Sequence, residues 1–226
     1  AFYNCTSLKS IELPNSLTTF GTSVFYGSGL ESITIPASVT TISNQLFRNA
    51  KSLKSVTMSD DVTSIGDQVF NSCVALESMK LPSSLTSLGA NAFNGCSALK
   101  SVEIPEGVTS IGNYSFQNCS ALETVNLPTG LKTLGTYMFD GCSMLKSIAV
   151  PEAITTIGNY MFRNCTSLAS VTMGSKVTTI SQYAFNGCSS LSNVIIPDSV
   201  TSIKENAFGY CYSLTSIIIP DSVTSI

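Results

Sequence analysis

The feature that most constrains this chain is a phenylalanine that returns at a fixed interval. Ten phenylalanines lie 23 residues apart, with a single step of 22: Phe2, Phe25, Phe47, Phe70, Phe93, Phe116, Phe139, Phe162, Phe185 and Phe208. Self-similarity at a period of about 20–50 residues is typical of solenoids and other repeat architectures. A single short copy cannot bury its own apolar face, so neighbouring copies must stack. The spacing therefore predicts one continuous array of ten 23-residue coils over residues 1–226.

One copy shows what each position does. The copy that begins at Leu99 reads LKSVEIPEGVTSIGNYSFQNCSA, and the shared pattern is LxxVxIPxxVxxIGxxxFxxCxx. Val102 and Ile104 alternate with polar residues, which indicates a short strand with both side chains facing inward. Pro105 cannot donate a hydrogen bond to a neighbouring strand, so we expect the strand to end there. Phe116 and Cys119 then close the coil on the same core.

This pattern resembles the BspA-like (Treponema pallidum-type) leucine-rich repeat family, whose repeat reads LxxLxLPxxLxxIGxxAFxxC. The match covers the whole chain, with local departures where Ser59 and Gly174 replace the proline and Ser28 and Ala50 replace the cysteine. The resemblance implies a leucine-rich-repeat solenoid, with one short parallel β-strand per coil in a right-handed curved array. It also implies a surface or secreted adhesion-type protein of host-associated microbes, without shared catalytic residues.

Composition and charge argue against several classes of partner. Only 11% of residues are charged and the net charge is −3, with no cluster of lysine and arginine, so nucleic acid is not an expected partner. No apolar stretch approaches the roughly 18 residues of a membrane span, so we expect no membrane insertion in this segment. The chain begins and ends in mid-repeat, at Ala1 and Ile226, and we expect it to be part of a longer protein.

Catalytic, metal and cofactor sites are not predicted. The chain has no histidine, and its fourteen Asp and Glu residues lie mostly at variable, outward repeat positions. General acid–base catalysis commonly uses histidine or paired carboxylates with shifted pKa values. The pair Asp60–Asp61 falls on a repeat turn, where a solvated loop is the favoured interpretation. No phosphate-binding or dinucleotide-binding motif is present. We therefore expect a protein that is not an enzyme and that holds no metal or cofactor.

Eight cysteines allow either a disulfide or a structural interpretation. Seven of them recur at the repeat spacing: Cys73, Cys96, Cys119, Cys142, Cys165, Cys188 and Cys211. Stacked copies would place neighbouring Cα atoms within reach of a disulfide, but parallel side chains suit the required torsion poorly. We favour a ladder of buried, reduced thiols that act as small apolar groups. Ser28 and Ala50 at equivalent positions agree with this, because a small group suffices there.

The position two residues after each phenylalanine predicts a left-handed turn. It is asparagine or glycine in eight copies, with Ser72 and Tyr210 as exceptions, and these two residue types tolerate a positive φ. Three of the four asparagines that match the N-glycosylation pattern, Asn4, Asn118 and Asn164, occupy this turn, whereas Asn113 does not. A role in the backbone explains these three asparagines, and glycosylation remains the alternative.

Outward positions carry the functional hypothesis. The residue after each first leucine alternates in charge over seven copies, from Lys9 through Lys146, which indicates ion pairs between neighbouring coils. The outward position in the middle of each strand is polar or charged in most early copies and becomes largely apolar toward the C-terminus. The residues of this candidate partner surface are Ala149, Thr172, Ile195 and Ile218. An apolar stripe marks a contact surface, unless adjoining segments cover it or the change is neutral drift.

Two functions follow from these patterns. The first is an extracellular or cell-surface binding module for cell adhesion, which recognises a protein or glycan ligand through its strand face, including host extracellular matrix as a candidate. The alternative is a structural spacer, or a unit that self-associates end to end through its open coil ends.

Overall fold

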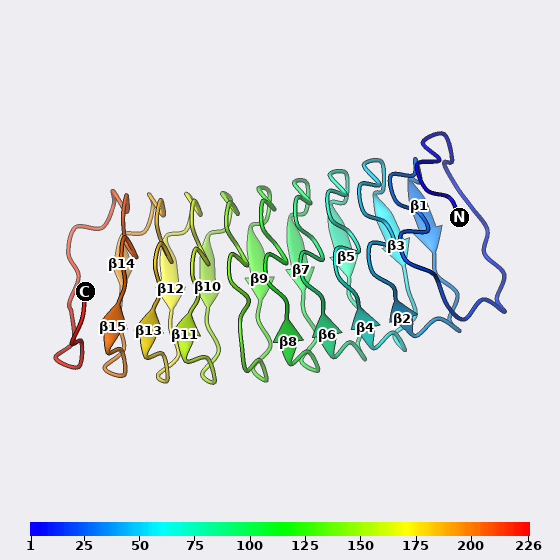
Figure 1. The fold of residues 1–226 in the computed structure, drawn as a ribbon. Coiled ribbons are helices and arrows are strands. Elements are labelled where there is room, and N and C mark those ends of the chain that lie inside the picture. The colour runs from blue at the N-terminus through cyan, green and yellow to red at the C-terminus, as the bar shows by residue number, and fades with distance from the viewer.

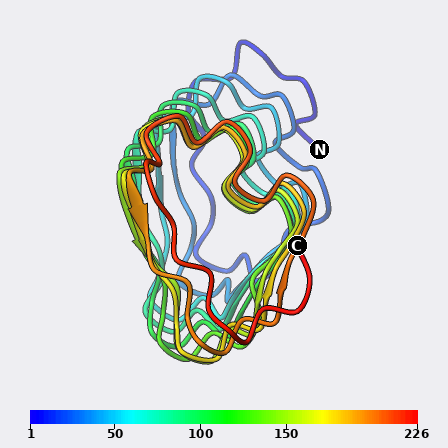
Figure 2. The same cartoon turned by 90° about the vertical axis from the view of Figure 1, so that its left-hand side faces the viewer.

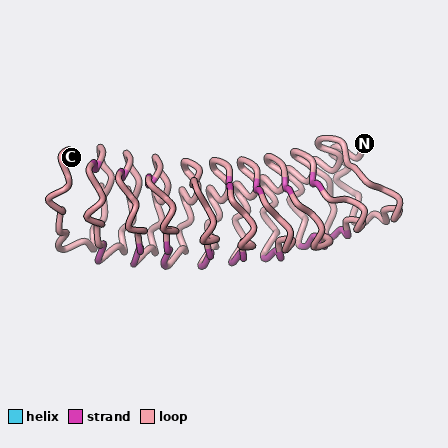
Figure 3. The backbone as a smooth tube through the Cα atoms, turned by 90° about the horizontal axis from the view of Figure 1, so that it is seen from below, coloured by secondary structure: helices cyan, strands magenta, loops and turns pink.

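The computed structural model describes residues 1–226 without a gap, and its chain winds as a solenoid (Figure 1). Strands and turns make up the whole structure, with no helix (Figure 3). Successive coils overlay when the molecule is seen end on, with the N-terminal coils displaced from the rest (Figure 2). The predicted leucine-rich-repeat solenoid with short parallel strands is therefore confirmed.

Each typical coil contains two short strands, and these form two separate rows along the array. The first row comprises β1 (Ser32–Thr34), β3 (Ser55–Thr57), β5 (Ser78–Lys80), β7 (Ser101–Glu103), β9 (Thr124–Asn126), β10 (Ser147–Ala149), β12 (Ser170–Thr172) and β14 (Asn193–Val194). The second row comprises β2 (Thr41–Ile42), β4 (Ser64–Ile65), β6 (Ser87–Leu88), β8 (Ser110–Ile111), β11 (Thr156–Ile157), β13 (Thr179–Ile180) and β15 (Ser202–Ile203). We call the outward side of the first row the strand face.

Strands pair in parallel with equivalent residues of the next coil. Ser32 pairs with Ser55, and Ala149 pairs with Thr172, so the register equals one repeat of 23 residues. The first row divides into the sheets β1-β3, β5-β7-β9 and β10-β12-β14, and the second into β2-β4-β6-β8 and β11-β13-β15. This register carries each outward position along the array as a straight line of equivalent side chains.

Most hydrogen bonds between coils lie outside the strands. Of 108 backbone hydrogen bonds, 99 belong to turns and loops, and many of these join one coil to the next. The loop around the repeated phenylalanine is typical: the N–H of Phe70 donates to the carbonyl oxygen of Ala92 at 2.8 Å, and the N–H of Ser72 donates to Asn94 at 2.7 Å. Buried backbone groups require such partners, which explains why coils with very short strands stack in register.

The core is a continuous ladder of the same side chains. One hydrophobic cluster runs from Phe25 to Cys211, and the eight repeated phenylalanines from Phe25 to Phe185 are fully buried within it. Neighbouring rings stack in parallel, with centroids 5.1–5.7 Å apart along this ladder. Each buried ring contributes roughly 1.5–3 kcal/mol before conformational entropy is subtracted.

The predicted count of ten coils is slightly too high. Seven turns carry both strands, and an eighth carries β9 with only an isolated bridge at Thr133 on the second row. The first and last copies of the repeat contain no strand. Along most of their length these two copies have a neighbouring coil on one side only, so they form fewer hydrogen bonds between coils than an inner copy. Their apolar residues, such as Leu8 and Ile217, are accordingly only partly buried.

Candidate binding surface

The residues of the predicted partner surface form one line on the strand face. We call Ala149, Thr172, Ile195 and Ile218 the C-terminal apolar row. Ala149 and Thr172 are register partners on β10 and β12, and Ile195 directly follows the paired residue Val194 of β14. All four side chains are exposed, Ile195 to 76% and Ile218 to 85%.

Strand alternation places these side chains outward. Val194 and Ile196, on either side of Ile195, are 6% and 5% exposed because they point into the core. A strand turns successive side chains to opposite faces, so a residue between two core positions must face solvent. Strand alternation therefore holds Ile195 outward. Ile218 lies in the last copy, which forms no strand, between the partly buried Ile217 and Ile219, which is 39% exposed.

The N-terminal part of the strand face is charged and hollowed. Lys80 and Glu103 occupy the outward position there, and Lys80 Nζ lies 3.5 Å from Asp60 Oδ2 of the preceding coil. A hollow of about 610 Å³ opens between the strands and the following turns, and Lys80, Glu103, Ser83 and Glu106 line it. The outward strand position and the turn position three residues later thus share one groove.

The predicted alternation of charges forms ion pairs between coils. Lys54 Nζ lies 3.2 Å from Glu31, Lys100 Nζ 2.9 Å from Glu77, and Lys146 Nζ 2.5 Å from a carboxylate oxygen of Glu123. Lys9 approaches Glu31 from the other side at 3.4 Å. Hydrogen bonds from lysine lower the pKa of Glu31, Glu77 and Glu123. After Lys146 the equivalent residues are Ala169, Ser192 and Thr215, so this row also loses its charge toward the C-terminus.

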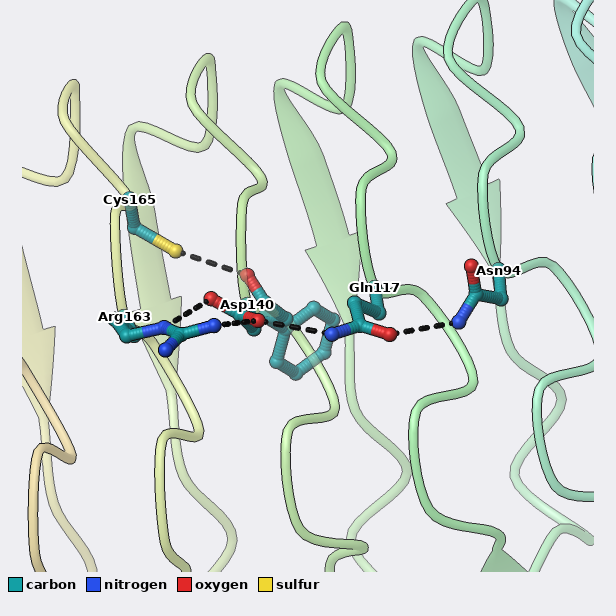
Figure 4. Close-up of polar contacts among 6 residues, drawn as sticks. Asn94, Gln117, Asp140, Arg163 and Cys165 are labelled. Atoms are coloured by element: carbon teal, nitrogen blue, oxygen red, sulfur yellow. Dashed lines mark hydrogen bonds and ion pairs between the residues drawn. The ribbon is translucent and has the colours of Figure 1, made fainter.

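The seven recurring cysteines are buried and unpaired in disulfides. Each Sγ donates a hydrogen bond to the carbonyl oxygen of the phenylalanine 26 residues earlier, as from Cys165 to Phe139 at 3.2 Å (Figure 4). Sequence reasoning treated the thiol as a small apolar group and missed this donor. Burial raises the pKa of the thiols, to about 12 for Cys119 and well above the usual value for Cys96.

The left-handed turn after each phenylalanine is present in all ten copies, including the exceptions Ser72 and Tyr210. A second left-handed position, two residues before the phenylalanine, was not predicted. In four consecutive copies it is a tyrosine with φ between 55° and 60°: Tyr114, Tyr137, Tyr160 and Tyr183. Such a backbone costs roughly 1–2 kcal/mol for a residue other than glycine. The rings stack at 4.5–4.9 Å, and this contact offsets part of the cost.

A row of polar side chains follows the phenylalanines through four coils (Figure 4). Asn94 Nδ2 donates to Gln117 Oε1 at 2.8 Å, and Gln117 Nε2 donates to Asp140 Oδ2 at 2.9 Å. From the other side, Arg163 donates through two nitrogens to the two carboxylate oxygens of Asp140, each at 2.8 Å. We call these four residues the polar row. Asp140 is the acceptor at its centre, and only 4% of its side chain is exposed.

Arg163 also contacts the stacked tyrosines. Its guanidinium carbon lies 4.9 Å from the ring centroid of Tyr160 and 5.9 Å from that of Tyr137. The hydrogen bonds to Asp140 raise the pKa of Arg163. The sequence signal for this network was a polar residue directly after each phenylalanine from Asn94 to Arg163. The polar row thus joins four neighbouring coils at equivalent positions, and its bonds to the Asp140 carboxylate are charge-assisted.

No three Cys, Asp or Glu side chains gather in a geometry that could hold a metal ion. No part of the chain forms a helix long and apolar enough to cross a bilayer. Asp61 and Ser59, at the predicted solvated turn, bond to each other on the surface.

Comparisons with known proteins agree with this architecture. The profile of the BspA type leucine rich repeat region, in six copies, matches residues 1–100, 63–191 and 155–226. A comparison with functionally characterised proteins gives no significant match.

Three solved structures are similar to the chain. A leucine-rich repeat protein of Treponema pallidum is 27% identical with a TM-score of 0.64, over 81% of this chain and 78% of that one. A leucine-rich repeat protein of Eubacterium ventriosum is 28% identical with a TM-score of 0.70, over 96% and 67%. A leucine rich cell surface protein of Faecalibacterium prausnitzii is 28% identical with a TM-score of 0.58, over 95% and 74%. Since the matched ranges together span residues 1–226, the chain belongs to the BspA-type leucine-rich repeat family.

Proposed function

We propose that this chain is a non-enzymatic binding module of an extracellular protein, and that it takes a protein partner on the C-terminal apolar row. The observation that carries the proposal is the exposure of Ile195 and Ile218, at 76% and 85%, on one line of the strand face. Aliphatic side chains held in solvent next to each other mark contact surfaces. A cell-surface protein among the similar structures supports the extracellular setting.

The geometry of the strand face favours binding. The strand β14, directly before Ile195, pairs with β12, so Ile195 loses little backbone freedom when a partner covers it. The adjacent outward residues, Asn193 and Ser216, are uncharged, so covering them removes no charge from water. The N-terminal part of the same face differs, because Lys80 and Glu103 would have to be desolvated.

The experiment is a binding assay with a matched surface control. Extracellular-matrix proteins and mucin glycans are immobilised, and wild-type protein is compared with the Ile195→Glu/Ile218→Glu variant. The control is Thr34→Glu/Thr57→Glu, which adds the same two charges at the same outward position of β1 and β3. We expect saturable binding of a protein by the wild type and the control, and a loss of about 10- to 100-fold in the isoleucine variant.

Other outcomes overturn the proposal in distinct ways. Equal loss in the control variant would show that charge anywhere on the strand face weakens binding. Binding to glycans alone would contradict a protein partner. No binding, together with light scattering that shows end-to-end growth with concentration, would replace the binding module with the self-associating structural unit.

A further inference from the structure

The turn that follows each strand of the first row carries a second regular pattern. Three residues after the outward strand position, acidic and hydroxyl residues alternate from coil to coil: Asp60, Ser83, Glu106, Thr129, Glu152 and Ser175. Each acid binds the hydroxyl-bearing residue of the next coil. Asp60 accepts from the Ser83 N–H at 3.0 Å, and Glu152 accepts from Ser175 at 2.7 and 2.8 Å. Glu106 binds Thr129 in the same way, at 3.1 and 2.9 Å.

The alternation breaks beside the C-terminal apolar row. The next two residues of this pattern are Asp198 and Asp221, so an acid is followed by a second acid. Both are exposed, and Asp198 forms no side-chain hydrogen bond or ion pair with the coil that follows it. Lys176 lies in the turn of the preceding coil. Hydrogen bonds from Ser175 and, after them, the charge of Lys176 lower the pKa of Glu152. Lys176 forms no ion pair with Asp198. Equivalent positions on adjacent coils lie about 4.8 Å apart, so two like charges are neighbours without a cation between them.

An earlier coil shows which side chain can pair with the acid of this turn. Asp60 and Lys80 stand in the same relation as Asp198 and Ile218, because the second pair lies 138 residues after the first, which is six repeats of 23. Lys80 Nζ lies 3.5 Å from Asp60 Oδ2, so a cation rising from the outward strand position reaches the acid of the preceding turn. At the C-terminus that strand position holds Ile218, and the chain supplies no cation there.

We propose that the segment docking on Ile195 and Ile218 is a protein segment with lysine or arginine next to aliphatic side chains, and that Asp198 and Asp221 receive the basic groups. This inference rests on the proposed function. The aliphatic stem of a lysine or arginine lies on apolar surface while its charged end reaches beyond it. An isoleucine beside an unpaired carboxylate complements both parts of such a side chain. An acidic segment or an anionic surface would be repelled.

The probe is a 12-residue peptide of alternating isoleucine and lysine, with an isoleucine–glutamate peptide and a serine–lysine peptide as comparisons. Affinities are measured by fluorescence anisotropy at two salt concentrations. The variants are Asp198→Asn/Asp221→Asn and Ile195→Ser/Ile218→Ser. The matched control, Glu12→Gln/Glu103→Gln, removes two exposed carboxylates from the N-terminal part of the same face. Thermal melts establish that all proteins are folded.

We expect the isoleucine–lysine peptide to bind the wild type and the control more tightly than either comparison peptide does. The Asn variant should weaken it by about 3- to 10-fold, with a smaller dependence on salt. Ile218→Lys should weaken it too, because the new ammonium reaches Asp198 as Lys80 reaches Asp60.

The two proposals fail differently. Unchanged affinity in the Asn variant with a loss in the Ser variant would overturn the role of the carboxylates and leave the apolar surface standing. A loss in the Asn variant alone would remove the apolar contact. No preference for the lysine peptide, or no binding of it, would overturn the inference.

Discussion

The two ends of the strand face share an interior and differ in their exterior. Beneath the N-terminal part, Ile33 and Val102 are 5% and 4% exposed, and beneath the C-terminal part Val171 and Val194 are 7% and 6% exposed. The outward position changes from charged and polar residues to mostly apolar ones. It runs Glu12, Thr34, Thr57, Lys80, Glu103, Asn126 and then Ala149, Thr172, Ile195, Ile218.

This contrast separates what the fold requires from what it permits. An inward residue must match the stacked ladder above and below it, so the same apolar types recur in every coil. An outward residue contacts only solvent and its neighbours on the face, so many types are compatible with the fold. Charged and hydroxyl residues occupy the outward strand position in the N-terminal coils. The fold therefore does not require isoleucine at Ile195 and Ile218. This is why we assign the partner to the C-terminal part of the strand face.

The largest expected effect is a loss of folding stability at alkaline pH, which should distinguish the two otherwise similar interiors. Buried thiols run from Cys73 to Cys211, while Ser28 and Ala50 stand at this position in earlier coils. Below about pH 8 the thiols are mostly protonated in both folded and unfolded chains. Above it the unfolded chain loses these protons, but burial holds the pKa of Cys119 at about 12 in the folded state. Stability should fall between about pH 9 and 12, by up to ~1.4 kcal/mol per pH unit for each thiol.

Thermal melts followed by circular dichroism across this pH range measure the effect, and limited proteolysis locates it. We expect the N-terminal coils to survive as the resistant fragment. A Cys119→Ala/Cys142→Ala variant provides the control, since Ala50 is fully buried at the equivalent position of an earlier coil. It should lose less stability over the same range, and an identical pH dependence in both proteins would refute the explanation.

The period of the sequence was enough to predict the solenoid, because each coil repeats one set of inward residues. The positive φ after phenylalanine followed from asparagine and glycine at that position. The positive φ at Tyr114 and its equivalents could not be predicted, because this position also holds serine, glutamine and asparagine in other copies. Its N–H bonds to the next coil, as from Tyr114 to Thr136. The polar row was missed for a similar reason, since Asp140 and Arg163 meet across a coil boundary.

The candidate surface could be located from the sequence only in part. Strand alternation was sufficient to place Ile195 and Ile218 outward. The unpaired state of Asp198 could not be predicted, because it depends on which side chain of the next coil bonds to it. The acid–hydroxyl alternation was visible in the sequence, yet its meaning came from the hydrogen bonds of Asp60, Glu106 and Glu152.

A second prediction concerns the polar row, which joins the two parts of the array. Asp140→Asn leaves Arg163 without a counter-charge and leaves fewer acceptors for Gln117. We expect a loss of about 1–2 kcal/mol, below that of a fully buried pair because solvent reaches part of Arg163. Urea denaturation measures it. Arg48, five coils earlier, binds Gln68 Oε1 at 2.6 Å without a carboxylate, so Arg48→Ala should cost less. Equal losses would contradict a special role for Asp140.

The smallest effect on stability should come from exchanging the two exteriors. In the variant Ile195→Thr/Ile218→Lys, the C-terminal part receives the residues found at Thr57 and Lys80. Both positions are exposed, and the new lysine can form an ion pair with Asp198 as Lys80 does with Asp60. The thermal midpoint should therefore not change measurably. Binding to the partner should be lost, because the apolar contact and the free carboxylate disappear together. A midpoint lowered by several degrees would mean that the outward isoleucines support the fold, and the separation between required interior and free exterior would then fail at this end of the solenoid.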